Sequence, residues 1–77
     1  MYEIEKTISF SDMQEIELFV KAAEKCSFDI DVFYDHAVID AKSLLGILAI
    51  GVRTRLKVCY GGLNANFEKV VAKLAVA

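Results

Sequence analysis

Apolar and polar residues alternate with a period of two in several short stretches of the chain, a pattern typical of β-strands that bury one face. Residues 2–10 and 28–34 show the pattern most clearly, and Leu56–Tyr60 repeats it. Residues 35–36 form a plausible turn, so Ala37–Asp40 is expected to return as the second strand of an antiparallel hairpin. Four strands are therefore predicted.

The segment between the first two strands has apolar residues three or four positions apart, which predicts an amphipathic helix over residues 12–26. Ser11 and Gln14 have the spacing of a capping box at its start. Glu17 lies nearer the N-terminal end and Lys21 follows four residues later, an order that suits the helix dipole. Periodicity, capping and charge thus agree on this helix.

Two more helices are predicted in the second half of the chain. The first, of two to three turns, is capped by Asp40 or Ser43 and is expected to end near Gly51. The second is capped by Asn64 or Asn66 and presents one apolar stripe. The members of the stripe are Phe67, Val70, Val71 and Leu74.

This order of elements, βαββαβα, predicts an α+β fold in which three helices cover one face of a four-stranded antiparallel sheet. A chain of 77 residues with 56% apolar and 26% charged residues fits one folded domain spanning residues 1–77. Its charge is uneven, because residues 1–41 hold ten acids and three bases, whereas residues 42–77 hold one acid and six bases. The two halves are expected to attract one another.

The predicted second helix is apolar on all sides, because Leu44, Leu45, Ile47, Leu48 and Ile50 surround its axis. So small a domain cannot bury all five, and we expect some to remain exposed as a contact surface. The apolar stretch around them is less than half of the roughly 20 residues that a membrane-spanning helix requires, so no membrane association is expected. The N-terminus lacks the pattern of an export signal, which favours a cytoplasmic location.

Few residues offer chemistry. Cys26 and Cys59 are isolated and lack the spacing of a metal motif, so we expect reduced cysteines that belong to the packing. Arg53, Arg55 and Lys57 alternate, but three charges without interleaved aromatic residues do not predict nucleic-acid binding. No nucleophile with a base, metal cluster or phosphate-binding loop is found, so neither an enzyme nor a bound cofactor is expected.

Two motifs resemble one known family. The sequence FVKAA at residues 19–23 resembles F-V-K-x-A in the first helix of HPr, the phosphocarrier protein of the bacterial phosphotransferase system. The sequence AKSLLG at residues 41–46, followed by Gly51, is similar to the family's more specific A-K-S-[IL]-[MF]-G segment before its second helix. From residue 19 to about residue 74 the chain follows the family pattern without a gap. The resemblance implies the βαββαβα fold of that family.

The segment that makes HPr a carrier is different in this chain. HPr has G-[LIVM]-H-A-R-P-A between its first strand and first helix, and the histidine receives a phosphoryl group from enzyme I. Here residues 10–16 fill the interval, which is about three residues shorter. Alignment with the family places Asp12 at the histidine, Gln14 at the arginine and Glu15 at the proline position. Carboxylates at a helix start repel a phosphoryl group, so we expect transfer by the usual route to fail.

Ser43 matches the serine that HPr kinase/phosphorylase modifies in the family, where the phosphoserine form acts as a regulatory signal and co-repressor. The resemblance therefore implies a docking surface for a kinase or a transcriptional repressor around this serine. That surface is predicted to consist of Lys42, Leu44, Leu45, Ile47 and Leu48. A plain N-cap role for Ser43 is the alternative.

These observations favour a regulatory protein-interaction module without carrier function, similar to the catabolite-repression HPr paralogue, which also lacks the histidine and retains the serine. One alternative is an atypical phosphocarrier that uses Asp12 or His36. Another is a degenerate scaffold that oligomerises through its second helix. The sequence leaves the oligomeric state and the identity of the partner open.

Overall fold

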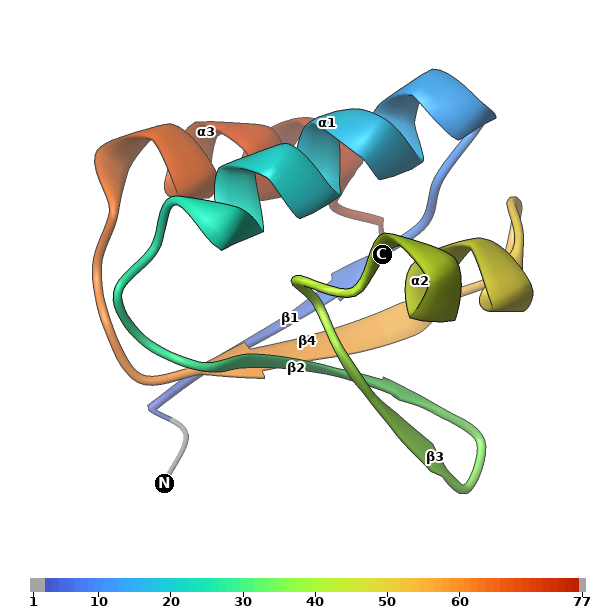
Figure 1. The fold of residues 1–77 in the computed structure, drawn as a ribbon, viewed down its shortest axis with the longest axis horizontal. Helices are drawn as coiled ribbons and strands as arrows, with labels where there is room; N and C mark the ends of the chain where they lie inside the picture. The colour runs from blue at the N-terminus through green and yellow to red at the C-terminus, as the bar shows by residue number, and fades with distance from the viewer. Residues whose placement is uncertain (1–2, 77) are drawn as a thin grey trace.

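The computed structural model describes residues 3–76 and consists of a four-stranded antiparallel sheet with three helices on one face (Figure 1). The α+β class and the βαββαβα order predicted from the sequence are confirmed. In chain order the elements are β1 (Ile4–Ile8), α1 (Met13–Glu24), β2 (Ile30–Tyr34), β3 (Ala37–Asp40), α2 (Leu44–Ile50), β4 (Leu56–Tyr60) and α3 (Ala65–Leu74).

The sheet has the strand order β1-β4-β2-β3, so the last strand of the chain lies inside the sheet. Val58 of β4 faces Lys6 of β1 on one side and Val32 of β2 on the other. The predicted hairpin of β2 and β3 forms, with Tyr34 opposite Ala37 beside the turn. Asp35 begins that turn with φ 56°, a left-handed conformation that aspartate tolerates better than most residues.

Two predicted strands are shorter than their alternation suggested. The first strand was expected over residues 2–10 and extends over Ile4–Ile8, with Tyr2 outside the described residues. The second begins at Ile30 rather than at Phe28, whose ring instead stacks on that of Tyr60 with 6.0 Å between centroids. Period-two alternation therefore continued beyond the residues that pair in the sheet.

Aromatic rings join the helices to the sheet in the core. Phe10, which follows β1, meets Phe19 of α1 edge-on with 5.3 Å between centroids. Phe67 of α3 lies 5.6 Å from Phe19 and 5.1 Å from Tyr60 of β4. All four residues are at most 1% exposed, so they account for much of the apolar area removed from water.

Helix α2 approaches β3 closely at a glycine. A Cβ atom on Gly46 would lie 2.8 Å from Cγ2 of Ile39, so any larger residue requires the Ile39 side chain or the nearby backbone to shift. The helix ends at Gly51, whose φ of 89° also favours glycine. Close packing therefore explains the glycine at position 46, and the backbone conformation explains the glycine at position 51.

The C-terminal segment is attached to the outer edge of β1. Ala75 forms an isolated bridge with Ile8, and the Val76 N–H donates to the Thr7 carbonyl at 3.0 Å. This edge of the sheet is therefore partly covered by the chain itself. Within residues 3–76, no helix has both the length and the apolar character that crossing a membrane would require.

Candidate functional site: the start of the first helix and the groove beside it

The start of α1 is closed by its own carboxylates. Asp12 is the N-cap, and its Oδ1 accepts a hydrogen bond from the Glu15 N–H at 2.9 Å. The Glu15 Oε1 accepts from the Ser11 N–H at 2.7 Å. The capping box predicted for Ser11 and Gln14 is wrong by one residue, because the helix begins at Met13 and so the aspartate, not the serine, occupies the N-cap.

The carboxylates make the helix start less favourable for an added anion. Free backbone N–H groups at a helix N-terminus bind anions, but here the Asp12 carboxylate already accepts from one of them. The carboxylates of Glu15 and the exposed Glu17 add negative charge within the first turns of the helix. The residues that the alignment puts at the carrier position therefore form an internal cap.

His36, the single histidine of the chain, lies at the tip of the β2–β3 hairpin. Its side chain is fully exposed, and Nε2 lies 3.9 Å from Oδ1 of Asp35. Figure 1 shows this hairpin tip on the sheet side of the molecule, away from the start of α1. The structure does not bring His36 and Asp12 together.

Ser43 lies at the N-cap of α2. Its Oγ accepts a hydrogen bond from the Gly46 N–H at 3.2 Å, and the residue is exposed. Of the two cap candidates, Asp40 instead accepts from the Lys42 N–H at 2.9 Å and shapes the turn before the helix. The hydroxyl of Ser43 is thus both a cap and an accessible group.

The other residues predicted for the contact surface have different environments. Leu45 is 81% exposed and Leu44 is 39% exposed, whereas Leu48 is half-buried. Ile47 is fully buried, so it supports the surface from beneath and cannot contact a partner. The Nζ of Lys42 donates to the Cys26 carbonyl at 3.0 Å. This hydrogen bond joins the residues just before α2 to the residues just after α1.

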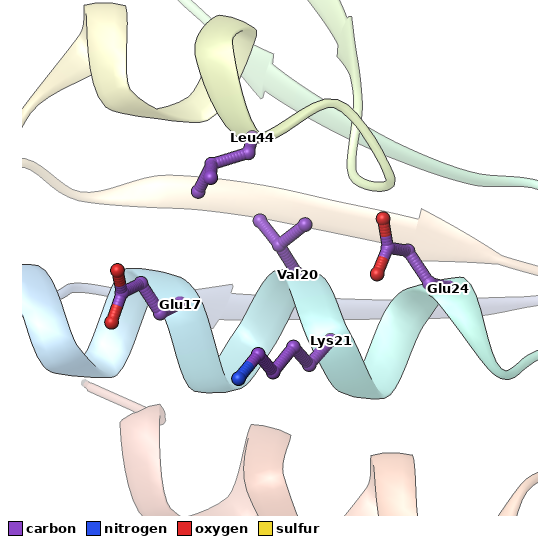
Figure 2. A pocket seen from close by; sticks show the side chains of 5 residues that line it. All are labelled: Glu17, Val20, Lys21, Glu24 and Leu44. Carbon is purple, nitrogen blue, oxygen red and sulfur yellow. The ribbon is translucent and has the colours of Figure 1, made fainter.

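A groove runs between α1 and α2 next to these residues (Figure 2). Val20 of α1 and Leu44 of α2 point toward each other across it, and the carboxylates of Glu17 and Glu24 rise on either side of Val20. The side chain of Lys21 leaves α1 on the opposite side, toward α3. The cavity has a volume of about 130 Å³ and is lined by these five residues.

Sequence reasoning missed the α1 side of this groove. Residues 17, 20, 21 and 24 follow the i, i+3, i+4, i+7 spacing of one helix face, which was the available signal. The spacing could not show that Leu44 lies opposite this face, because that depends on a long-range contact between the two helices.

The structure also shows the environments of the two cysteines and of the alternating basic residues. Cys26 and Cys59 are free and buried, as expected of packing residues, and burial raises the pKa of both thiols. Within residues 3–76, no group of three or more potential ligands is placed to hold a metal ion. Arg53 adopts φ 62°, so the regular alternation that would put it on one face with Arg55 and Lys57 is not kept.

The topology and the helix-covered sheet define an HPr-like fold. A solved structure that shares it is that of the phosphocarrier protein HPr from Bacillus anthracis strain Ames, with a TM-score of 0.71 and 22% sequence identity. The similarity covers 92% of this chain and 95% of that one. No family model and no curated protein sequence matches this chain. At this identity the likeness establishes the fold.

Proposed function

We propose that this protein is an HPr-like interaction module that does not carry phosphate on its first helix and is regulated by phosphorylation of Ser43. The observation that carries the first part is the capped helix start, where the Asp12 carboxylate accepts from one of the backbone N–H groups that would otherwise be free to bind a phosphoryl group. No imidazole lies at that position, since the only histidine is at the hairpin tip. The module therefore acts by binding other proteins.

Three features at the start of α2 support Ser43 as the regulatory residue. Ser43 is exposed, so a kinase can reach its hydroxyl. A phosphate there can accept from the Gly46 N–H, which the Oγ atom already contacts at 3.2 Å. Leu44 and Leu45 next to it expose apolar surface, which a kinase or repressor can bury.

The test compares two phosphoryl donors. With HPr kinase and labelled ATP we expect label on the wild-type protein and none on Ser43→Ala, whereas enzyme I with labelled phosphoenolpyruvate should label neither protein. Asp12→Ala and His36→Ala serve as controls, because they remove the side chains of the rival phosphocarrier hypothesis. Label from enzyme I that disappears in either control would establish a carrier and contradict the proposal. Absence of kinase label on the wild type would remove the regulatory role of Ser43.

A further inference from the structure

Helix α1 distributes its charges between two sides. Glu17 and Glu24 border the groove toward α2, whereas Lys21 and Lys25 border a second groove toward α3. Lys21 lines both grooves, but its side chain leaves on the α3 side (Figure 2). The groove toward α2 is therefore largely apolar, and its charged lining residues, Glu17, Lys21 and Glu24, give it a net negative charge.

The size of this groove limits what can occupy it. Its volume of about 130 Å³ is well below the roughly 300–1,000 Å³ of pockets that hold small-molecule ligands. Val20 is 3% exposed and forms the floor, and Leu44 is 39% exposed and forms one wall. The space suits a single aliphatic side chain of a partner.

The spacing of the rim suits a helix. Glu17 and Glu24 are seven residues apart on α1, which corresponds to about 10 Å along the helix axis. Two lysines seven residues apart on a partner helix have the same separation. Neither carboxylate forms an ion pair within residues 3–76, so both can receive such lysines.

We propose that the groove between α1 and α2 binds a basic amphipathic helix of a partner protein. One aliphatic side chain of that helix enters between Val20 and Leu44, and basic residues on each side pair with Glu17 and Glu24. The inference rests on the proposed function, because it specifies the partner of that interaction surface. A phosphate on Ser43, next to Leu44, adds negative charge beside the same rim and strengthens the binding.

The test uses unphosphorylated, isotope-labelled protein and two synthetic helical peptides of about 15 residues. One peptide has leucine at its centre with lysines three and four residues to either side; the other has glutamates in place of the lysines. We expect the lysine peptide to shift amide resonances of α1 and α2 and the glutamate peptide to shift none. The double substitution Glu17→Lys/Glu24→Lys should lower the affinity for the lysine peptide about tenfold or more, because two attractions between opposite charges become repulsions between like charges.

A matched double variant distinguishes the effect of charge at the groove from the effect of the protein's net charge. Glu3→Lys/Glu5→Lys changes the net charge by the same amount just before and within β1, the strand at the opposite edge of the sheet from β3, and should bind like the wild type. Equal binding of both peptides, equal loss in the two double variants, or no shift in α1 and α2 would overturn the proposal. Because no phosphate is involved, such a failure is distinct from failure of kinase labelling at Ser43.

Discussion

At the start of α1, a carboxylate does what an external anion does at many helix starts. Asp12 accepts from the Glu15 N–H, and Glu15 in turn accepts from the Ser11 N–H. The negative side chains favour the helix through its dipole and, by charge, disfavour a second anion at the same place. Under the function proposed above, the cap that stabilises the helix is also the reason that the helix carries no phosphate.

Replacing Asp12 by alanine should lower the free energy of unfolding by about 1 kcal/mol, since an N-cap hydrogen bond is lost. For a domain of this size that corresponds to a fall of roughly 4–8 °C in melting temperature. Thermal unfolding followed by circular dichroism measures it. Gln14→Ala, which changes an exposed residue of the same turn, should shift the midpoint much less; equal shifts would refute the cap assignment.

Individual caps were only partly predictable from the sequence. Ser43 and Asn64 were each one of two candidates, and the structure selects them through bonds to the Gly46 and Phe67 N–H groups. At α1 the sequence favoured Ser11, and Asp12 proved to be the cap. Adjacent serine and aspartate have similar capping propensity, so the sequence alone could not decide between them.

At the scale of elements, α2 combines buried and exposed apolar residues within seven positions. Its all-round apolarity predicted partial exposure, and the structure places Ile47 at 0% and Leu45 at 81% exposure. Periodicity could not tell the two apart, because both faces of the helix are apolar. The contact with β3 at Gly46 decides which face points inward.

Two alanine substitutions on α2 should therefore differ strongly. Ile47→Ala leaves a cavity in the core and should cost about 2–5 kcal/mol, whereas Leu45→Ala should change stability by less than about 0.5 kcal/mol. Urea unfolding of both variants measures the difference. Similar losses would mean that Leu45 is buried in solution, as in an oligomer formed through α2, and light scattering of the wild type would then give a mass above that of one chain.

At the scale of the whole molecule, a side-chain hydrogen bond links the sheet to the helical layer. The hydroxyl of Tyr60 on β4 donates to the Glu68 carboxylate of α3 at 2.7 Å. Burial, and then this bond, raise the pKa of Tyr60 well above its ordinary value of 10.0. At alkaline pH the phenol of Tyr60 therefore keeps its proton in the folded protein and loses it in the unfolded chain.

This pKa shift predicts how stability depends on pH. Above about pH 10 the unfolded tyrosine loses its proton while the folded one keeps it, so the stabilising contribution of Tyr60 decreases as pH rises. Tyr60→Phe should lose about 1–2 kcal/mol near neutral pH, and the gap to the wild type should narrow between pH 9 and pH 11. Denaturant unfolding at several pH values measures the gap; a constant gap would contradict the assignment.

The overall arrangement was predictable because alternation, helical spacing and order of elements all favoured one α+β layout. The groove was not, since Val20 and Leu44 are far apart in sequence and meet only when α1 and α2 pack side by side. The conformation at Arg53 was not predictable for a related reason, because its backbone N–H donates to the Phe10 carbonyl at 2.7 Å, a contact between distant parts of the sequence.

The segment that pairs with β1 also affects how copies of the chain can meet. With Ala75 and Val76 along the outer side of β1, the other edge, β3, offers the more accessible unpaired backbone within residues 3–76. Two molecules joined through β3 would leave only the partly covered edge of β1 for a third. The short C-terminal segment thus makes strand addition beyond a pair less favourable.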